Sequence, residues 1–102
     1  MEIIKLIINN MVKFYKARDG VHKFVAKFDD GEIVKFGALG YDDFTITGDK
    51  NQKKNYLARH RKREDWTDPK TPGALSRYIL WNKPTLEESI KHYVKKFHMH
   101  LE

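Results

Sequence analysis

The chain has 102 residues, of which 20 are Lys or Arg and 14 are Asp or Glu, so its formal net charge is +6. A chain of this length builds one modest hydrophobic core, which excludes large multidomain enzymes and predicts a single domain over residues 1–102. With 40% hydrophobic residues, it is too apolar for a disordered basic tail. The absence of cysteine excludes a disulfide framework, a cysteine nucleophile and a cysteine-based zinc site.

Residues 3–8 form a short apolar run that Lys5 interrupts and Glu2 precedes. The run is too short for a membrane span and lacks the basic stretch of a signal peptide, so we expect a soluble intracellular protein that does not bind membranes. Its β-branched residues favour a strand within residues 1–16, although the apolar spacing there also fits a helix.

Residues 23–36 alternate apolar and polar side chains on either side of residues 29–31, which predicts two strands joined by a tight turn. We prefer a three-residue loop to a two-residue loop because it gathers the apolar side chains on one face. Gly31 then takes the left-handed bulge position, with positive φ. The predicted register places Ala26 opposite Val34 and Phe24 opposite Phe36.

Two further features extend this sheet. Asp19 and Gly20 form an earlier turn of the same kind, and residues 41–47, with Phe44 and Ile46 spaced by two, predict another strand. Residues 1–48 are therefore expected to form a β-meander of three or four antiparallel strands.

Residues 49–98 show helical spacing instead. A helix is predicted over residues 50–64, which lack Gly and Pro, and a shorter one from the N-cap Thr71 to about Trp81, with Pro72 at its first position. A last helix begins after Thr85, which forms a capping box with Glu88.

The predicted fold class is α+β, with the meander packed against two or three C-terminal helices. The apolar stripe of the last helix packs on the sheet. The predicted core residues are Phe24, Phe28, Phe36, Ile90, Tyr93, Val94 and Phe97.

The helix predicted over residues 50–64 carries the main indication of function. A narrow seam of Tyr56, Leu57 and His60 is expected to dock it, leaving positive charge facing outward. Like charges at helical spacing repel, and the phosphate backbone of DNA or RNA is the commonest partner that offsets such repulsion. Residues 50–63 include seven basic residues and no acidic residue: Lys50, Lys53, Lys54, Arg59, Arg61, Lys62 and Arg63.

Aromatic residues lie close to this basic cluster and predict base stacking. Tyr56 lies inside the cluster, Trp66 follows it, and Arg77 is a further basic residue between aromatic neighbours. We expect Tyr78 and Trp81 to belong to the core. The sequence therefore predicts nucleic-acid binding without sequence specificity, in which Trp66 or Tyr56 stacks on bases.

Three alternatives remain for the basic cluster. In the first, the cluster is a solvated surface that Glu64, Asp65 and Asp68 partly neutralise. In the second, residues 59–63 are a nuclear localisation signal. In the third, the protein is a virion structural or assembly adaptor whose basic face meets an acidic viral or host protein.

No enzyme motif emerges from the sequence. His60 beside Glu64, Asp65 and several arginines comes nearest to a nuclease site, but adjacent carboxylates point in different directions and form no dyad. The C-terminal histidines are not spaced as metal ligands. We predict no enzymatic activity, no cofactor and no metal.

Residues 35–46, 56–60 and 75–85 carry a resemblance that spans about residues 22–97. They resemble a family of small proteins from nucleocytoplasmic large DNA viruses, most specifically in residues 80–85, Leu-Trp-Asn-Lys-Pro-Thr. The resemblance implies a viral origin and a location in a cytoplasmic virus factory, the host nucleus or the virion. It implies no catalytic residue, and residues 1–16 depart from the family pattern.

Overall fold

The computed structural model describes residues 10–102. Its strands are β1 (Met11–Lys16), β2 (His22–Phe28), β3 (Ile33–Ala38) and β4 (His100–Leu101). Its helices are α2 (Phe44–Thr47), α3 (Lys50–His60), α4 (Pro72–Leu75), the π-helical turn η1 (Ser76–Leu80) and α5 (Leu86–Lys96).

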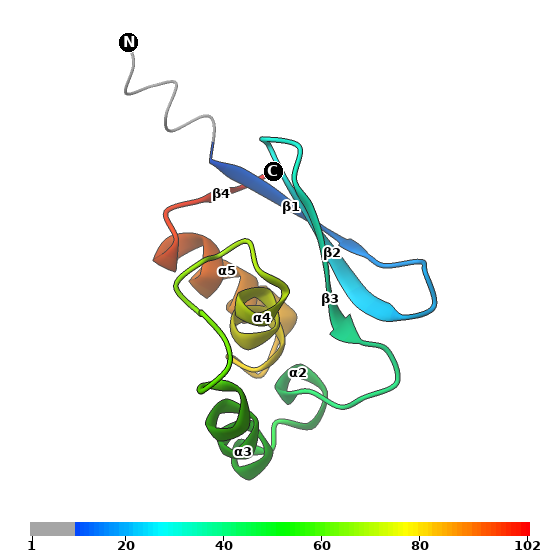
Figure 1. Ribbon diagram of the computed structural model, residues 1–102, viewed down its shortest axis with the longest axis vertical. Coiled ribbons are helices and arrows are strands. Elements are labelled where there is room, and N and C mark those ends of the chain that lie inside the picture. The colour runs from blue at the N-terminus through cyan, green and yellow to red at the C-terminus, as the bar shows by residue number, and fades with distance from the viewer. Residues whose placement is uncertain (1–9) are drawn as a thin grey trace.

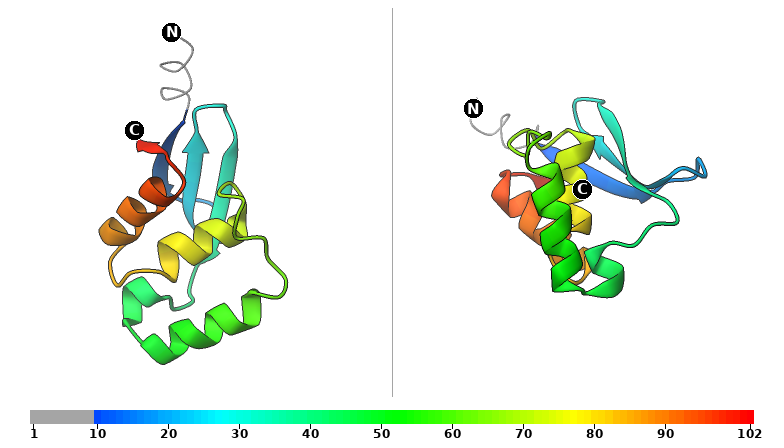
Figure 2. Two further views of the ribbon diagram at one scale, coloured as in Figure 1. Left: turned by 90° about the vertical axis from the view of Figure 1, so that its left-hand side faces the viewer. Right: turned by 60° about the horizontal axis from the view of Figure 1, so that its bottom comes forward.

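The strands form one sheet in the order β3-β2-β1-β4, and the helices gather on one side of it (Figure 1). β1, β2 and β3 are antiparallel, whereas β4 runs parallel to β1. The α+β fold class predicted from the sequence is confirmed. Two turned views show α3 crossing one end of the molecule (Figure 2). In residues 10–102, no helix has both the length and the apolar character that crossing a membrane requires.

The predicted hairpin register is confirmed. Ala26 lies opposite Val34 and Phe24 lies opposite Phe36. Gly31 has φ of 92°, as expected for the left-handed position of a three-residue loop. The turn at Asp19 and Gly20 also joins two strands, β1 and β2.

The core lies between the sheet and the layer formed by α4, η1 and α5. Alternate residues of β2 and β3 are buried, because successive strand residues point to opposite faces. Tyr93 is fully buried, and its hydroxyl donates to the carbonyl oxygen of Pro69 at 2.7 Å. Of the predicted core residues, Phe28, Phe36 and Tyr93 are buried. The others are half-buried and pack against the core: Phe24, Ile90, Val94 and Phe97.

The strand predicted for residues 41–47 is wrong, because this segment is a loop followed by α2. The buried Asp43 caps α2, accepting a hydrogen bond from the backbone nitrogen of Thr45 at 2.8 Å. Gly48 ends the helix in the left-handed conformation. Capping at both ends stabilises this helical turn. The spacing of Phe44 and Ile46, which predicted a strand, gives no sign of these caps.

The fourth strand comes from the C-terminal end of the chain and was not predicted. His100 donates its backbone hydrogen to the carbonyl oxygen of Asn10 at 2.9 Å, and Glu102 donates to that of Val12 at 2.9 Å. The strand expected within residues 1–16 is present as Met11–Lys16. The rest of that prediction falls on residues 1–9, which lie outside the described residues.

Two helical predictions need correction at their ends. The helix predicted over residues 50–64 ends at His60, where residues 61–63 turn and Arg63 donates to the carbonyl oxygen of His60 at 3.0 Å. The helix starting at Thr71 widens into η1, because Trp81 donates its backbone hydrogen to Ser76, five residues earlier, at 3.1 Å. Thr85 is confirmed as the N-cap of α5, since its hydroxyl accepts from the backbone nitrogen of Glu88 at 3.2 Å. The Glu88 carboxylate accepts from the Thr85 hydroxyl at 3.1 Å, where a full capping box would have it accept from the Thr85 backbone nitrogen.

We predict that Gly37→Ala destabilises the fold more than Gly40→Ala does. Both glycines have positive φ, which costs an L residue about 1 kcal/mol. A Cβ at Gly37 would also lie 2.8 Å from Cδ1 of Leu80, whereas Gly40 has open space. Overpacking adds about 1–3 kcal/mol. Thermal unfolding should show the larger drop for Gly37→Ala, and equal drops would contradict this close packing.

Candidate nucleic-acid interface

An aromatic stack docks α3 on the rest of the molecule. The ring of Tyr56 lies parallel to that of Trp81, with 4.3 Å between centroids and 7° between planes. His60 stacks on Tyr56 at 4.1 Å. Tyr56 is 8% exposed, and burial raises its pKa, so the hydroxyl stays neutral at physiological pH. The predicted seam is therefore confirmed, because Leu57 is also half-buried.

Tyr56 does not present a free ring for base stacking, contrary to the sequence prediction. One of its stacking partners is Trp81 and the other is His60. A base would have to displace His60 to reach the ring. The burial that docks α3 thus removes Tyr56 from the accessible surface.

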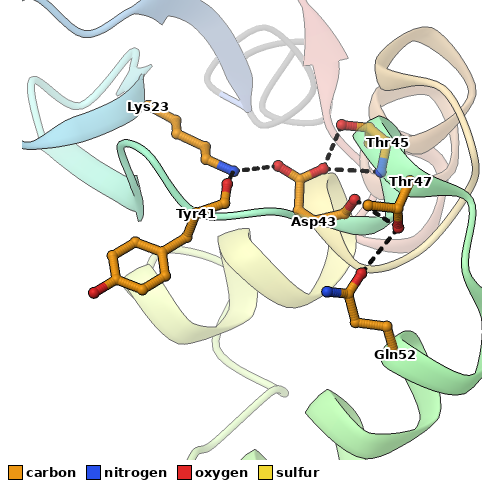
Figure 3. A network of polar contacts seen from close by, with 6 residues as sticks. All are labelled: Lys23, Tyr41, Asp43, Thr45, Thr47 and Gln52. Carbon is orange, nitrogen blue, oxygen red and sulfur yellow. Dashed lines mark hydrogen bonds and ion pairs between the residues drawn. The ribbon is translucent and has the colours of Figure 1, made fainter.

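A polar network centred on Asp43 places α2 and the start of α3 (Figure 3). The carboxylate of Asp43 accepts from Nζ of Lys23 at 2.6 Å and from Thr45. Thr47 continues the network by donating to the side-chain oxygen of Gln52 at 2.9 Å. Asp43 is 2% exposed, so the pair joins β2 to the segment that precedes α3 within the protein interior.

Asp49 begins α3 as its N-cap. Its carboxylate accepts from the backbone nitrogens of Asn51 at 2.9 Å and Gln52 at 3.1 Å. A charged N-cap satisfies otherwise unpaired donors and complements the positive end of the helix. No acidic residue follows it within α3, so the basic residues of the helix meet no carboxylate on their own element.

Six of the seven predicted basic residues are exposed, and together they define the basic surface. No carboxylate in residues 10–102 lies within 4.0 Å of their cationic nitrogens. Most of the ion pairs in the described part of the chain use lysines outside this surface. The six residues are Lys50, Lys54, Arg59, Arg61, Lys62 and Arg63.

The carboxylates considered as neutralising partners bind elsewhere. Glu64 pairs with Nδ1 of His60 at 3.3 Å and accepts from Nε1 of Trp66 at 3.0 Å. Asp65 accepts from Thr67, and Asp68 accepts from the backbone nitrogen of Lys70. The basic surface therefore keeps its positive charge within the described part of the chain.

Lys53 faces inward and is not part of the exposed surface. Its Nζ donates to the backbone carbonyl of Asn82 at 2.6 Å and lies 4.9 Å from the ring centroid of Phe44. Burial lowers the pKa of Lys53, and the positive charges of Arg77, Lys83 and Lys50 add to this effect. Lys83 was not among the predicted site residues, because only the fold brings it near α3.

A shallow groove of about 480 Å³ runs along the exposed side of α3. Lys50, Lys54 and Arg61 line it together with Lys53, and the apolar side chain of Phe44 contributes to its lining. Cations around an apolar lining suit a phosphate strand with its attached sugars.

The two other predicted contact residues, Trp66 and Arg77, lie next to each other and are only partly exposed. The guanidinium of Arg77 lies 5.5 Å from the ring of Trp66 and 4.9 Å from that of Tyr78. It also donates to the backbone carbonyl of Trp81 at 3.3 Å. Arg77 and Trp66 are both half-buried, so Arg77 contributes its charge to this region while Trp66 presents only part of its ring.

A larger cleft of about 830 Å³ lies on the other side of α3 and was not predicted. Arg59, His60 and Glu64 line it, together with residues of β2 and β3. His60 and Glu64 are paired there, as in the nuclease-like arrangement considered above, but Asp65 turns away to Thr67. Within residues 10–102, no three His, Asp or Glu side chains form a group suited to a metal ion.

Residues 12–60 are similar to a protein family described as a family of unknown function (DUF5754). The matched segment runs from β1 to the end of α3, so it includes the meander and three of the six residues of the basic surface, Lys50, Lys54 and Arg59. The description of the family names no activity. No curated protein and no solved structure matches the chain.

We predict that Asp43→Asn lowers the free energy of unfolding by about 3 kcal/mol, because it leaves the ammonium of Lys23 without its buried partner. Asp42→Asn is the matched control, since Asp42 is exposed, and it should change stability by less than about 0.5 kcal/mol. Urea unfolding measures both variants. Equal stabilities would show that the pair does not anchor this segment.

We predict that Tyr56→Ala costs about 3 kcal/mol and releases α3, because the stack with Trp81 is lost and a cavity forms. Tyr41→Ala removes an aromatic ring that is 73% exposed and should have almost no effect. Urea unfolding gives the stability, and near-ultraviolet circular dichroism reports the packing of Trp81. An unchanged spectrum in Tyr56→Ala would contradict the docking role of the stack.

Proposed function

We propose that this protein binds nucleic acid without sequence specificity, through phosphate contacts made by the basic surface. The observation that carries the proposal is that all six cations of this surface are exposed and have no carboxylate partner in residues 10–102. The positive side chains of such a surface repel one another, and a bound anion offsets this repulsion. A phosphate backbone supplies regularly spaced negative charges along one direction.

The position of α3 supports this function. The helix lies across the end of the molecule opposite the C-terminus, and its outer side is clear of the other elements (Figures 1 and 2). A duplex or a single strand can therefore lie along α3 without meeting the sheet. Because phosphate contacts carry no sequence information, binding is expected to be independent of sequence.

The proposed role in the cell is that of a small viral accessory protein. The resemblance to proteins of nucleocytoplasmic large DNA viruses supports this role and a location in a cytoplasmic virus factory, the host nucleus or the virion. It also suggests viral structural or host proteins as further partners. Nucleic acid is abundant at each of these locations, so the viral role and the proposed binding are compatible.

Fluorescence anisotropy with double-stranded and single-stranded DNA and RNA at several salt concentrations tests the proposal. The logarithm of the affinity should fall with the logarithm of the salt concentration, with a slope of about −5 for six phosphate contacts on duplex DNA. The triple variant Arg59→Glu, Arg61→Glu and Arg63→Glu should not bind at physiological salt, although its exposed side chains leave the fold intact.

A second triple variant controls for net charge. Lys16→Glu, Lys27→Glu and Lys95→Glu change exposed residues of β1, β2 and α5, and the formal charge changes by three times −2, from +6 to 0, as in the first variant. The control should keep most of the affinity. Equal losses in the two variants would mean that binding follows net charge alone, and the proposal would then be wrong.

The second candidate function is that of a virion structural or assembly adaptor. It is favoured by exposed apolar side chains on and beside β3, an edge strand among the described strands. If this is the function, nucleic-acid affinity stays weak throughout and reversing the basic surface blocks incorporation into particles. Normal incorporation would argue against it. The exposed apolar residues are Val21, Ile33, Leu39 and Tyr41.

A further inference from the structure

A second group of cations converges from three elements beyond the basic surface. Lys53 reaches from α3 to the carbonyl oxygen of Asn82 at 2.6 Å. Arg77 of η1 and Lys96 of α5 both lie over the ring of Tyr78, at 4.9 and 5.5 Å from its centroid. We call this group the η1–α5 cluster. Its five residues are Lys53, Arg77, Lys83, His92 and Lys96.

His92 and Lys83 complete the cluster. Nδ1 of His92 lies 2.7 Å from the amide nitrogen of Asn82, and its ring lies 6.2 Å from that of Tyr78. With the amide nitrogen donating to Nδ1, the neutral ring carries its hydrogen on Nε2, which remains a donor. Lys83 follows Asn82 in the chain and is exposed.

No carboxylate balances these charges in the part of the chain that the structure describes. None of the five cluster residues takes part in an ion pair there. Burial lowers the pKa of His92, and so do the positive charges of Lys83, Lys96, Arg77 and Lys53. The four cations therefore repel one another and disfavour protonation of His92, which is unfavourable in a protein without an anion to offset the charge.

The cluster continues the basic surface. Lys53 belongs to the cluster and also lines the groove along α3 with Lys50, Lys54 and Arg61. Burial lowers the pKa of Arg77, and the positive charge of Arg61 adds to this effect. Lys83 and Lys96 are exposed, which leaves the far end of this line of cations open to a ligand.

We propose that the η1–α5 cluster is a second phosphate-binding surface, which takes phosphate groups of the same nucleic-acid strand beyond those that α3 contacts. This inference rests on the proposed function, since it extends the path of the nucleic acid from α3 to the C-terminal half of α5. The five residues are Lys53, Arg77, Lys83, His92 and Lys96.

The phosphate also links binding to the protonation of His92. The added proton goes to Nδ1, and the Asn82 amide then presents its oxygen to that nitrogen in place of its NH2 group. A phosphate among these groups stabilises the protonated ring, so the pKa of His92 is higher in the complex than in the free protein. The complex then takes up a proton, and affinity rises as the pH falls through the pKa of His92. The charged and polar groups facing His92 are Lys53 of α3, Arg77 and Tyr78 of η1, Asn82 and Lys83 of the following loop, and Lys96 of α5.

Salt dependence of binding to duplex DNA tests the surface. The double variant Lys83→Ala, Lys96→Ala should bind more weakly, and its slope should be shallower than that of the wild type by about 1.8, or 0.9 for each lost contact. The matched control is Lys91→Ala, Lys95→Ala, which removes the same charge from exposed residues of α5 outside the cluster and should keep the wild-type slope. Equal slopes in the two double variants would overturn the inference.

This result is independent of the test of the basic surface. If reversing Arg59, Arg61 and Arg63 abolishes binding while Lys83→Ala, Lys96→Ala behaves as its control, the proposed function stands and the second surface does not exist. If the arginine reversal has no effect but Lys83→Ala, Lys96→Ala flattens the slope, the second surface stands and the role of α3 is wrong.

His92→Gln tests the protonation step. The wild type should bind more tightly as the pH falls from about 8 to about 5, and His92→Gln should show a smaller increase. The other four histidines are the same in both proteins, so the difference isolates His92. Identical pH dependence would exclude His92 from the surface, and thermal unfolding confirms that each variant remains folded.

Discussion

The stack of Tyr56 on Trp81 is the interaction on which the position of α3 depends. Tyr56 is the one residue of α3 that is buried, and most of the remaining surface of the helix is polar or charged. A helix so polar has little tendency to pack, so one aromatic contact and its flanking residues must hold it. The pair of Asp43 with Lys23 assists by fixing the segment that leads into the helix.

Because docking uses so little of α3, the rest of the helix is free to carry charge. The carboxylates that follow it are occupied by His60, Trp66 and backbone donors, which leaves the cations of the basic surface without partners in residues 10–102. Near the end of η1, burial and repulsion by neighbouring cations together lower the pKa values of Lys53 and Arg77. An extended polyanion fits this distribution of charge better than a compact acidic ligand, since the cations run across three elements.

The hairpin could be predicted because only one loop length places its apolar residues on one face, and periodicity of this kind is visible in the sequence. The strand predicted at residues 41–47 was wrong because the alternation there is short, and capping by Asp43 and Gly48 decides the local structure. The basic surface was predictable as a run of neighbouring residues. The inward turn of Lys53 was not, because its partner Asn82 lies 29 residues away.

The most direct measurement of the central claim is the backbone amide spectrum of isotope-labelled protein during titration with a short DNA duplex. If the basic surface contacts phosphate, the largest chemical-shift changes fall in residues 50–63. If the second surface also contacts it, further changes fall in residues 77–83 and around His92 and Lys96. Changes confined to the strands, with residues 50–63 unaffected, would contradict the proposed function.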